Sequence, residues 1–127
     1  MNRTKSDAEA QSIPELDAEK TNKALSILGF AMRARRLELC TEQVLNSVRK
    51  HGNPEKKAFG VVLCASDNSA NTDKRIINSC KYYNVECYRM QIGSNELALK
   101  MGKGASVSSV AIFDAGFVKA IRKIINN

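Results

Sequence analysis

The side chains best suited to chemistry in this sequence are small and polar, and they are grouped in three segments. These are the start of a predicted helix at Thr41, the stretch 66–72 and the stretch 102–109. If a sheet brings the ends of its strands to one edge, the three segments lie close together. The basic residues that border them are Arg35, Arg36, Lys74 and Lys103. Backbone amides and basic side chains suit phosphates, and small polar side chains suit base edges, so the pattern predicts an RNA-binding edge.

Glu42 has two interpretations at this edge. Guanine offers N–H donors that only an acceptor can satisfy, so the carboxylate of Glu42 could read a base. An acidic residue in the first turn also stabilises a helix through its dipole, by about 0.3 to 1 kcal/mol. The residue types alone leave both interpretations open.

Catalytic chemistry has weaker support, because a nucleophile paired with a base is absent from the pattern. The stretch "GKGAS", 102–106, lacks the full spacing of a phosphate-binding loop and is typical of a turn. Asp67 and Asp73 flank a polar loop where open α/β sheets often bind ligands, but Asp also favours turns and caps. His51 is placed to end a helix. We therefore predict a protein that is not an enzyme and that has no metal site and no cofactor.

The composition predicts one compact domain behind a polar lead. Residues 1–20 hold three basic and five acidic side chains, a net charge of −2. Since the whole chain has a net charge of +7, the other 107 residues carry +9. A basic domain of this kind most often serves nucleic acid. The four cysteines lack metal-ligand spacing, and Cys64 and Cys80 sit in apolar surroundings typical of a core. We expect a flexible lead at 1–20, a domain at 21–127, and a cytoplasmic monomer without membrane contact.

Hydrophobic spacing predicts helices and strands in alternation. An apolar stripe from Ala24 to Met32 predicts the first helix, which begins either at Ser12 or at Thr21. Asn71 or Thr72 is the predicted cap of the third helix, and Asp114 that of the last. Strands are predicted at 37–39, 58–66, 85–92 and 107–114, and the other helices at 40–50, 71–83, 94–101 and 115–125. Such alternation implies a sheet between helical layers.

From Asn22 to Ile125 the chain resembles the kink-turn-binding ribosomal-protein superfamily, and specifically its bacterial YlxQ-like branch. The segments that carry the resemblance are "KALSILGFAMRARRLELCTEQVL", "VLCASDNSANTDKRIINSCKYYNVECYRM", "ELALKMGKG" and "VAIFDAGFVKAI". The resemblance implies a three-layer α/β/α sandwich with a mixed four-stranded sheet, RNA binding and no catalysis. It also implies that the helix facing RNA begins with the positions that fall on Cys40, Glu42, Gln43 and Asn46.

This sequence departs from the pattern of that superfamily at three places. Cys40 replaces a glycine that lets the backbone approach RNA, and Asn46 replaces a lysine. The loop before the last strand is short, which leaves Val107 as its main apolar candidate for RNA contact. Restoring glycine at position 40 is expected to cost about 0.5 to 1 kcal/mol of stability through unfolded-state entropy. These departures affect kink-turn specificity more than general RNA binding.

Two functions from different classes follow from these observations. The first is binding of structured RNA, including ribosomal RNA, in or near the ribosome, with ribosomal or translation proteins as further partners. The alternative is a protein-interaction adaptor on the same fold, with RNA binding weakened or lost. The predicted RNA-binding residues are Arg35, Arg36, Cys40, Thr41, Glu42, Gln43, Asn46, Asn68, Ser69, Lys74, Lys103 and Val107.

Overall fold

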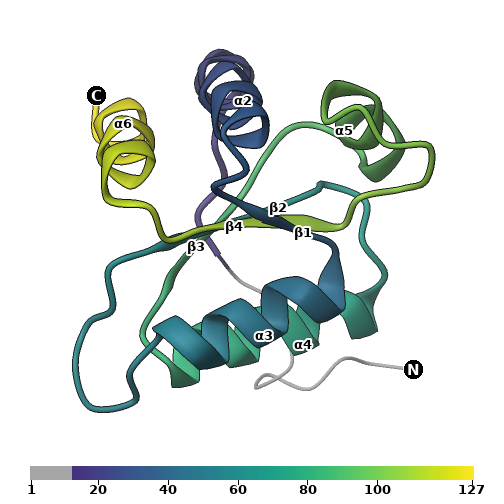
Figure 1. Ribbon diagram of the computed structural model, residues 1–127. Helices are drawn as coiled ribbons and strands as arrows, with labels where there is room; N and C mark the ends of the chain where they lie inside the picture. Colours follow the sequence, from purple (N-terminus) through teal and green to yellow (C-terminus); the bar gives the residue numbers. More distant parts are fainter. Residues whose placement is uncertain (1–12) are drawn as a thin grey trace.

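Helices cover both faces of a four-stranded sheet in the computed structural model, which describes residues 13–127 (Figure 1). Helices α2, α5 and α6 lie over one face, and α3 and α4 lie over the other. The predicted three-layer α/β/α sandwich is therefore confirmed. The elements in chain order are α2 Ala18–Arg33, β1 Glu38–Leu39, α3 Thr41–His51, β2 Val61–Cys64, α4 Ala70–Tyr82, β3 Glu86–Arg89, α5 Ser94–Lys100, β4 Ser109–Ile112 and α6 Ala115–Ile125.

The sheet is mixed, as the resemblance implies. Its strand order is β1-β4-β2-β3, so β2 and β4 are central. β2 runs parallel to β3 and antiparallel to β4, and β1 pairs antiparallel with β4. The register places Cys64, the last residue of β2, opposite Ser109, the first residue of β4. The end of β2 and the start of β4 therefore meet at one edge of the sheet.

The central strand β2 is apolar throughout because both faces of the sheet are covered there. Side chains alternate along a strand, so Val61 and Leu63 of β2 join the cluster under α2, α5 and α6. Val62 and Cys64 join the cluster under α3 and α4. All four residues are at most 1% exposed. This burial explains the continuous apolar run that predicted a central strand.

The N-terminal boundary differs from the expected one. Asp17 caps α2 through its side chain, so the helix begins at Ala18 rather than at Thr21, and Ser12 lies outside the described residues. Leu16 is 3% exposed, and its N–H donates to the carbonyl of Arg89 at 2.8 Å. Residues 13–20 thus pack on the domain, because a buried leucine and a backbone bridge hold them there. No helix between residues 13 and 127 is long and apolar enough to cross a membrane.

The predicted cap of α4 is wrong by two to three positions. Ser69 caps the helix, since its Oγ accepts a hydrogen bond from the N–H of Thr72 at 3.2 Å. The loop before α4 is rich in side chains able to cap, so composition alone did not select Ser69 over Asn71. Asp114 is confirmed as the cap of α6, where it accepts from the N–H groups of Gly116 and Phe117.

Candidate nucleic-acid interface

The three polar segments singled out in the sequence meet at one hollow of about 300 Å³, which we call the polar pocket. They meet because β1 and β4 pair up to this edge, where the N–H of Cys40 donates to the carbonyl of Ser109 at 3.0 Å. The polar loop after β2 ends at the same place. The residues lining the polar pocket are Cys40, Thr41, Asp67, Asn68, Ser69, Thr72, Ser94, Ser106 and Ser108.

Hydrogen bonds between these segments fix the shape of the polar pocket. The hydroxyl groups of Thr41 and Ser108 are 2.7 Å apart, which joins the start of α3 to the segment before β4. The side-chain amide of Asn68 donates to the carbonyl of Ser108 at 2.9 Å. Ser108 therefore holds both neighbouring segments, and the polar surface is formed before any ligand binds.

Among the helix starts between residues 13 and 127, the start of α3 is the one whose N–H groups donate no hydrogen bond to a side chain. Side-chain oxygens cap α2, α4 and α6, and Asp67 Oδ1 accepts from the N–H of Ser94 at the start of α5 at 2.8 Å. No side chain makes a capping hydrogen bond at the start of α3, where Cys40 is the N-cap. The first N–H groups of a helix attract anions, so this open turn is suited to bind one.

Cys40 has a backbone conformation that normally belongs to glycine. Its φ is 75° and its ψ is 158°, a region that side chains rarely enter and that costs about 1 to 3 kcal/mol. The backbone at position 40 therefore has a conformation that suits the glycine of the superfamily pattern. The Cys40 side chain is exposed, whereas Cys64, Cys80 and Cys87 are buried. The predicted core role of Cys64 and Cys80 is confirmed, and a hydrogen bond with Cys87 together with burial raises the pKa of the Cys64 thiol.

A second hollow, of about 600 Å³, adjoins the polar pocket at Cys40, and we call it the middle groove. It contains the cations of Arg35 and Lys103 and the amide of Gln43, all of which were predicted as site residues. The residues lining it are Met32, Arg35, Leu37, Glu38, Leu39, Cys40, Gln43 and Lys103. The structure therefore brings most of the predicted residues into two adjoining hollows.

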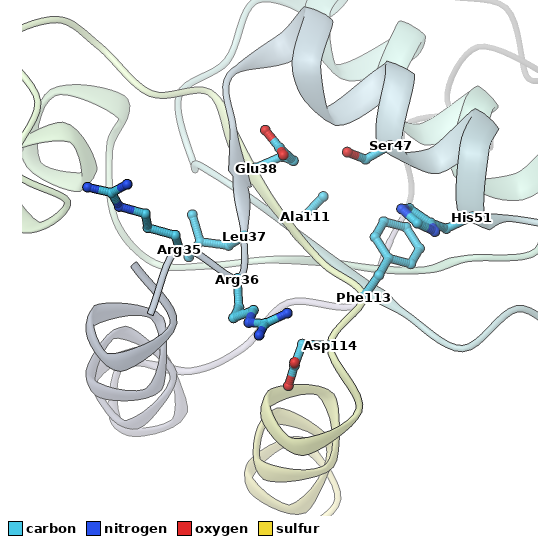
Figure 2. A pocket seen from close by; sticks show the side chains of 9 residues that line it. All are labelled: Arg35, Arg36, Leu37, Glu38, Ser47, His51, Ala111, Phe113 and Asp114. Carbon is cyan, nitrogen blue, oxygen red and sulfur yellow. The ribbon is translucent and has the colours of Figure 1, made fainter. Parts of the chain in front are cut away.

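Five other predicted residues do not line either hollow, and the first three are Arg36, Asn46 and Lys74. Arg36 lines a third hollow, beside His51 and Phe113 (Figure 2). Asn46 accepts a hydrogen bond from Arg49 at 2.9 Å on the exposed side of α3. Lys74 is exposed on α4. Their spacing along the sequence could not show which way each side chain points.

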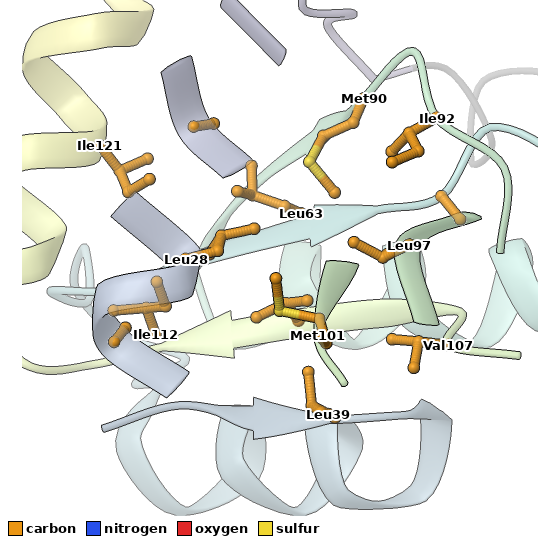
Figure 3. Close-up of a cluster of buried hydrophobic side chains, with 14 of the residues drawn as sticks. Leu28, Leu39, Leu63, Met90, Ile92, Leu97, Met101, Val107, Ile112 and Ile121 are labelled. Atoms are coloured by element: carbon orange, nitrogen blue, oxygen red, sulfur yellow. The ribbon is translucent and has the colours of Figure 1, made fainter. Parts of the chain in front are cut away.

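Val107 contradicts the prediction of an apolar contact with RNA. Its side chain is 1% exposed and lies in the core near Leu97 and Met101 (Figure 3). Side chains of an extended segment alternate between faces, so burial of Val107 turns Ser106 and Ser108 towards the polar pocket. These serines were not predicted as site residues, although the alternation "SVS" before β4 could have revealed them.

Glu42 is already paired in the structure. Its carboxylate lies 2.6 Å from the guanidinium of Arg75 on α4, and the two side chains are 72% and 44% exposed. An exposed pair of this kind adds little stability, so a ligand could replace either partner. No sequence pattern indicated Arg75, because the two residues meet only through the packing of α3 against α4.

The two acids of the weak enzyme hypothesis serve the fold. Asp67 meets the start of α5, as described above. Asp73 is 8% exposed and forms an ion pair with Arg89 at 3.0 Å, which ties the first turn of α4 to β3. Both carboxylates are thus explained by structural contacts.

Comparisons with known proteins agree with this architecture, although no protein-family model matches the chain. The chain is 32% identical over 103 residues to the RNA-binding protein YlxQ of Enterococcus faecium, covering 81% of this chain and 91% of the relative. It is also 32% identical over 100 residues to the RNA-binding protein YlxQ of Bacillus subtilis, covering 79% and 92%.

Two solved structures share the fold. A protein of unknown function from Bacillus halodurans C has a TM-score of 0.67 and 28% identity, with coverage of 83% of this chain and 98% of that one. The 15.5kD RNA-binding protein of Giardia lamblia has a TM-score of 0.71 at 12% identity, with coverage of 91% and 92%, a likeness of fold alone. By its sequence identity to the two YlxQ proteins over most of its length, this chain belongs to the YlxQ family.

Proposed function

We propose that this protein binds structured RNA, without catalysis, at the open start of α3. The observation that carries the proposal is the uncapped first turn of α3, which faces a polar pocket that the fold has already shaped. The YlxQ relatives are named as RNA-binding proteins, which supports the same partner. The positive charge of the domain adds the long-range attraction that RNA binding needs.

Each part of the site has a role in this proposal. The N–H groups at the start of α3 receive a phosphate, and Arg35 and Lys103 in the middle groove neutralise its neighbours. The hydroxyl and amide groups of Thr41, Asn68 and Ser69 contact base edges or sugars. Glu42 accepts a hydrogen bond from a base once RNA has displaced Arg75 from its carboxylate.

Salt dependence tests this proposal. If roughly three to five phosphates are neutralised, the logarithm of affinity should fall against the logarithm of salt concentration with a slope of about −2 to −5. Lys103→Gln should make the slope shallower by about one unit, whereas Lys123→Gln on α6 should leave it unchanged. The measurement is a fluorescence titration of total cellular RNA at four salt concentrations. A flat salt response, or retention of cellular proteins without RNA, would favour the adaptor function.

Kink-turn recognition and association with translation are finer parts of the proposal. They rest on the resemblance to the superfamily, and Cys40 and Asn46 are the departures that bear on them. If those departures weaken kink-turn binding, Cys40→Gly combined with Asn46→Lys should strengthen binding to a standard kink-turn RNA. Both single variants must be measured beside the double variant, because the two positions can couple. If the folded double variant binds kink-turn RNA no more tightly than the unchanged protein, the departures at positions 40 and 46 are not what weakens kink-turn binding.

A further inference from the structure

Three adjoining hollows, which share lining residues in pairs, follow β1 and α3, and we call this series the path. The polar pocket and the middle groove share Cys40. The middle groove shares Arg35, Leu37 and Glu38 with a third hollow of about 290 Å³, which we call the histidine hollow. The residues lining the histidine hollow are Arg35, Arg36, Leu37, Glu38, Ser47, His51, Ala111, Phe113 and Asp114. The path therefore runs from the first turn of α3 to its last, a length of about 15 Å.

The histidine hollow differs in chemistry from the rest of the path. The rings of His51 and Phe113 lie with their centroids 4.8 Å apart and their planes tilted by 31°. Phe113 also lies against Gly60, where a Cβ atom would come within 2.3 Å of the ring. The Phe113 ring is thus held between Gly60 and His51, and His51 itself is exposed. This arrangement presents the imidazole ring on a rigid aromatic support.

Charged groups of both signs surround this ring pair. Figure 2 shows Arg36 reaching into the space between the ring pair and Asp114, with Glu38 and Ser47 on the opposite side. The carboxylates of Glu38 and Asp114 accept hydrogen bonds from N–H groups and repel phosphates. The guanidinium groups of Arg35 and Arg36 attract phosphates. Acceptors and cations together suit a nucleotide better than they suit a free phosphate.

We propose that RNA bound at the polar pocket continues as a single strand through the middle groove, and that one unpaired base stacks on His51. The proposal rests on the proposed function, because the strand enters from that site. A base stacked inside a duplex cannot offer its face to a side chain, so the histidine hollow favours unpaired, unstacked nucleotides. Arg36 holds the phosphate of this nucleotide, and Glu38 or Asp114 accepts from its base. The preferred RNA is therefore structured at one end of α3 and single-stranded at the other.

Nuclear magnetic resonance can test the proposal directly, because His51 is the only histidine of the chain. The probes are a blunt-ended kink-turn RNA and the same RNA with eight adenosines added at its 5′ or 3′ end. We expect both RNAs to shift the amide signals of Thr41 and Glu42. We expect only one extended RNA to shift the His51 ring signals, with an affinity roughly five- to tenfold above that of the blunt RNA.

The outcomes separate this inference from the proposed function. Shifts at Thr41 and Glu42 with unmoved His51 signals for every RNA would overturn the single-strand path and leave the proposed site intact. Failure of every RNA to shift Thr41 and Glu42 would overturn kink-turn binding at the start of α3 and, with it, the path that starts there, whereas the salt titration of total cellular RNA tests the proposed function separately. An affinity gain from the extension without movement of His51 would also overturn the path.

Two substitutions, each with a matched control, complete the test. His51→Gln should abolish the gain from the extension and leave binding of the blunt RNA unchanged, whereas Phe30→Ala, at an aromatic side chain 55% exposed on α2, should preserve the gain. Arg36→Gln should reduce the gain, and Arg33→Gln should not, because Arg33 lines none of the three hollows. Equal effects of a variant and its control would contradict the proposal.

Discussion

Helices α3 and α4 begin at the same pocket, but their first turns are built differently. Ser69 caps α4, and the buried pair of Asp73 with Arg89 anchors its first turn to the sheet. At the start of α3 the N-cap is Cys40, in a backbone conformation typical of glycine, and no side chain caps the helix. The protein itself caps the start of α4, whereas the N–H groups at the start of α3 are left open for a ligand. We infer that α4 supplies stability at this edge and that α3 supplies binding.

The largest expected effect comes from removing the ion pair that anchors α4 to the sheet. Asp73→Ala should lower the free energy of unfolding by about 3 kcal/mol, because it leaves the largely buried guanidinium of Arg89 without its carboxylate. Urea denaturation measures the change. Glu19→Ala is the control, since it removes an exposed pair with Lys23 and should cost less than about 1 kcal/mol. Equal losses in the two variants would show that the buried pair does not anchor α4.

The next effect concerns the side chain that joins the two helices. Glu42→Ala should lower affinity for the preferred RNA by roughly 1 to 3 kcal/mol relative to random RNA if the carboxylate meets a base edge. Competition titration with both RNAs gives the difference. Because Arg75 loses its partner in this variant, Glu42→Ala with Arg75→Ala must be measured beside it. An equal change on both RNAs would mean that Glu42 only positions Arg75 and stabilises the helix.

The strained start of α3 reverses an expectation from the sequence. The expected cost of Cys40→Gly assumed an ordinary backbone conformation, but φ of 75° with ψ of 158° favours glycine. Relief of strain should exceed the entropic cost, so the variant should gain about 1 to 2 kcal/mol of unfolding free energy. Cys40→Ala is the matched control, because it keeps a Cβ atom and should gain nothing. Equal stability of the glycine and alanine variants would show that Cys40 is not strained.

The smallest effect sharpens the contrast between the two caps. Ser69→Ala should cost about 1 kcal/mol of unfolding free energy, because the N–H of Thr72 loses its acceptor. Ser66→Ala, in the same loop, should change stability by less than half of that amount. Thermal denaturation followed by circular dichroism is sufficient. If both substitutions are equally mild, α4 is no better capped than α3.

Residues whose roles depend on local pattern were predicted from the sequence. The unbroken apolar run of β2 and the position of Asp114 before an amphipathic helix indicated the sandwich and the cap of α6. Convergence of the three polar segments at one edge also followed from the alternation of strands and helices. Ser69 was not selected, because several neighbouring side chains can cap a helix equally well.

Side-chain direction and contacts between distant segments were not predictable from the sequence. Val107 is an exception, because it was expected at the surface although the alternation "SVS" before β4 favours the burial that the structure shows. Arg36 follows Arg35 directly, yet only Arg35 reaches the middle groove. The pair of Glu42 with Arg75 depends on how α3 packs against α4. The positions of Arg36 and Glu42 are set by tertiary packing, which residue type and spacing do not encode locally.

Alkylation of Cys40 tests most directly whether RNA binds at the open start of α3. Cys40 is the exposed cysteine and lies between the polar pocket and the middle groove, whereas the other three cysteines are buried. The rate at which iodoacetamide modifies Cys40 should fall at least fivefold when the folded protein is saturated with its preferred RNA. Saturating RNA that leaves this rate unchanged would contradict binding at the start of α3.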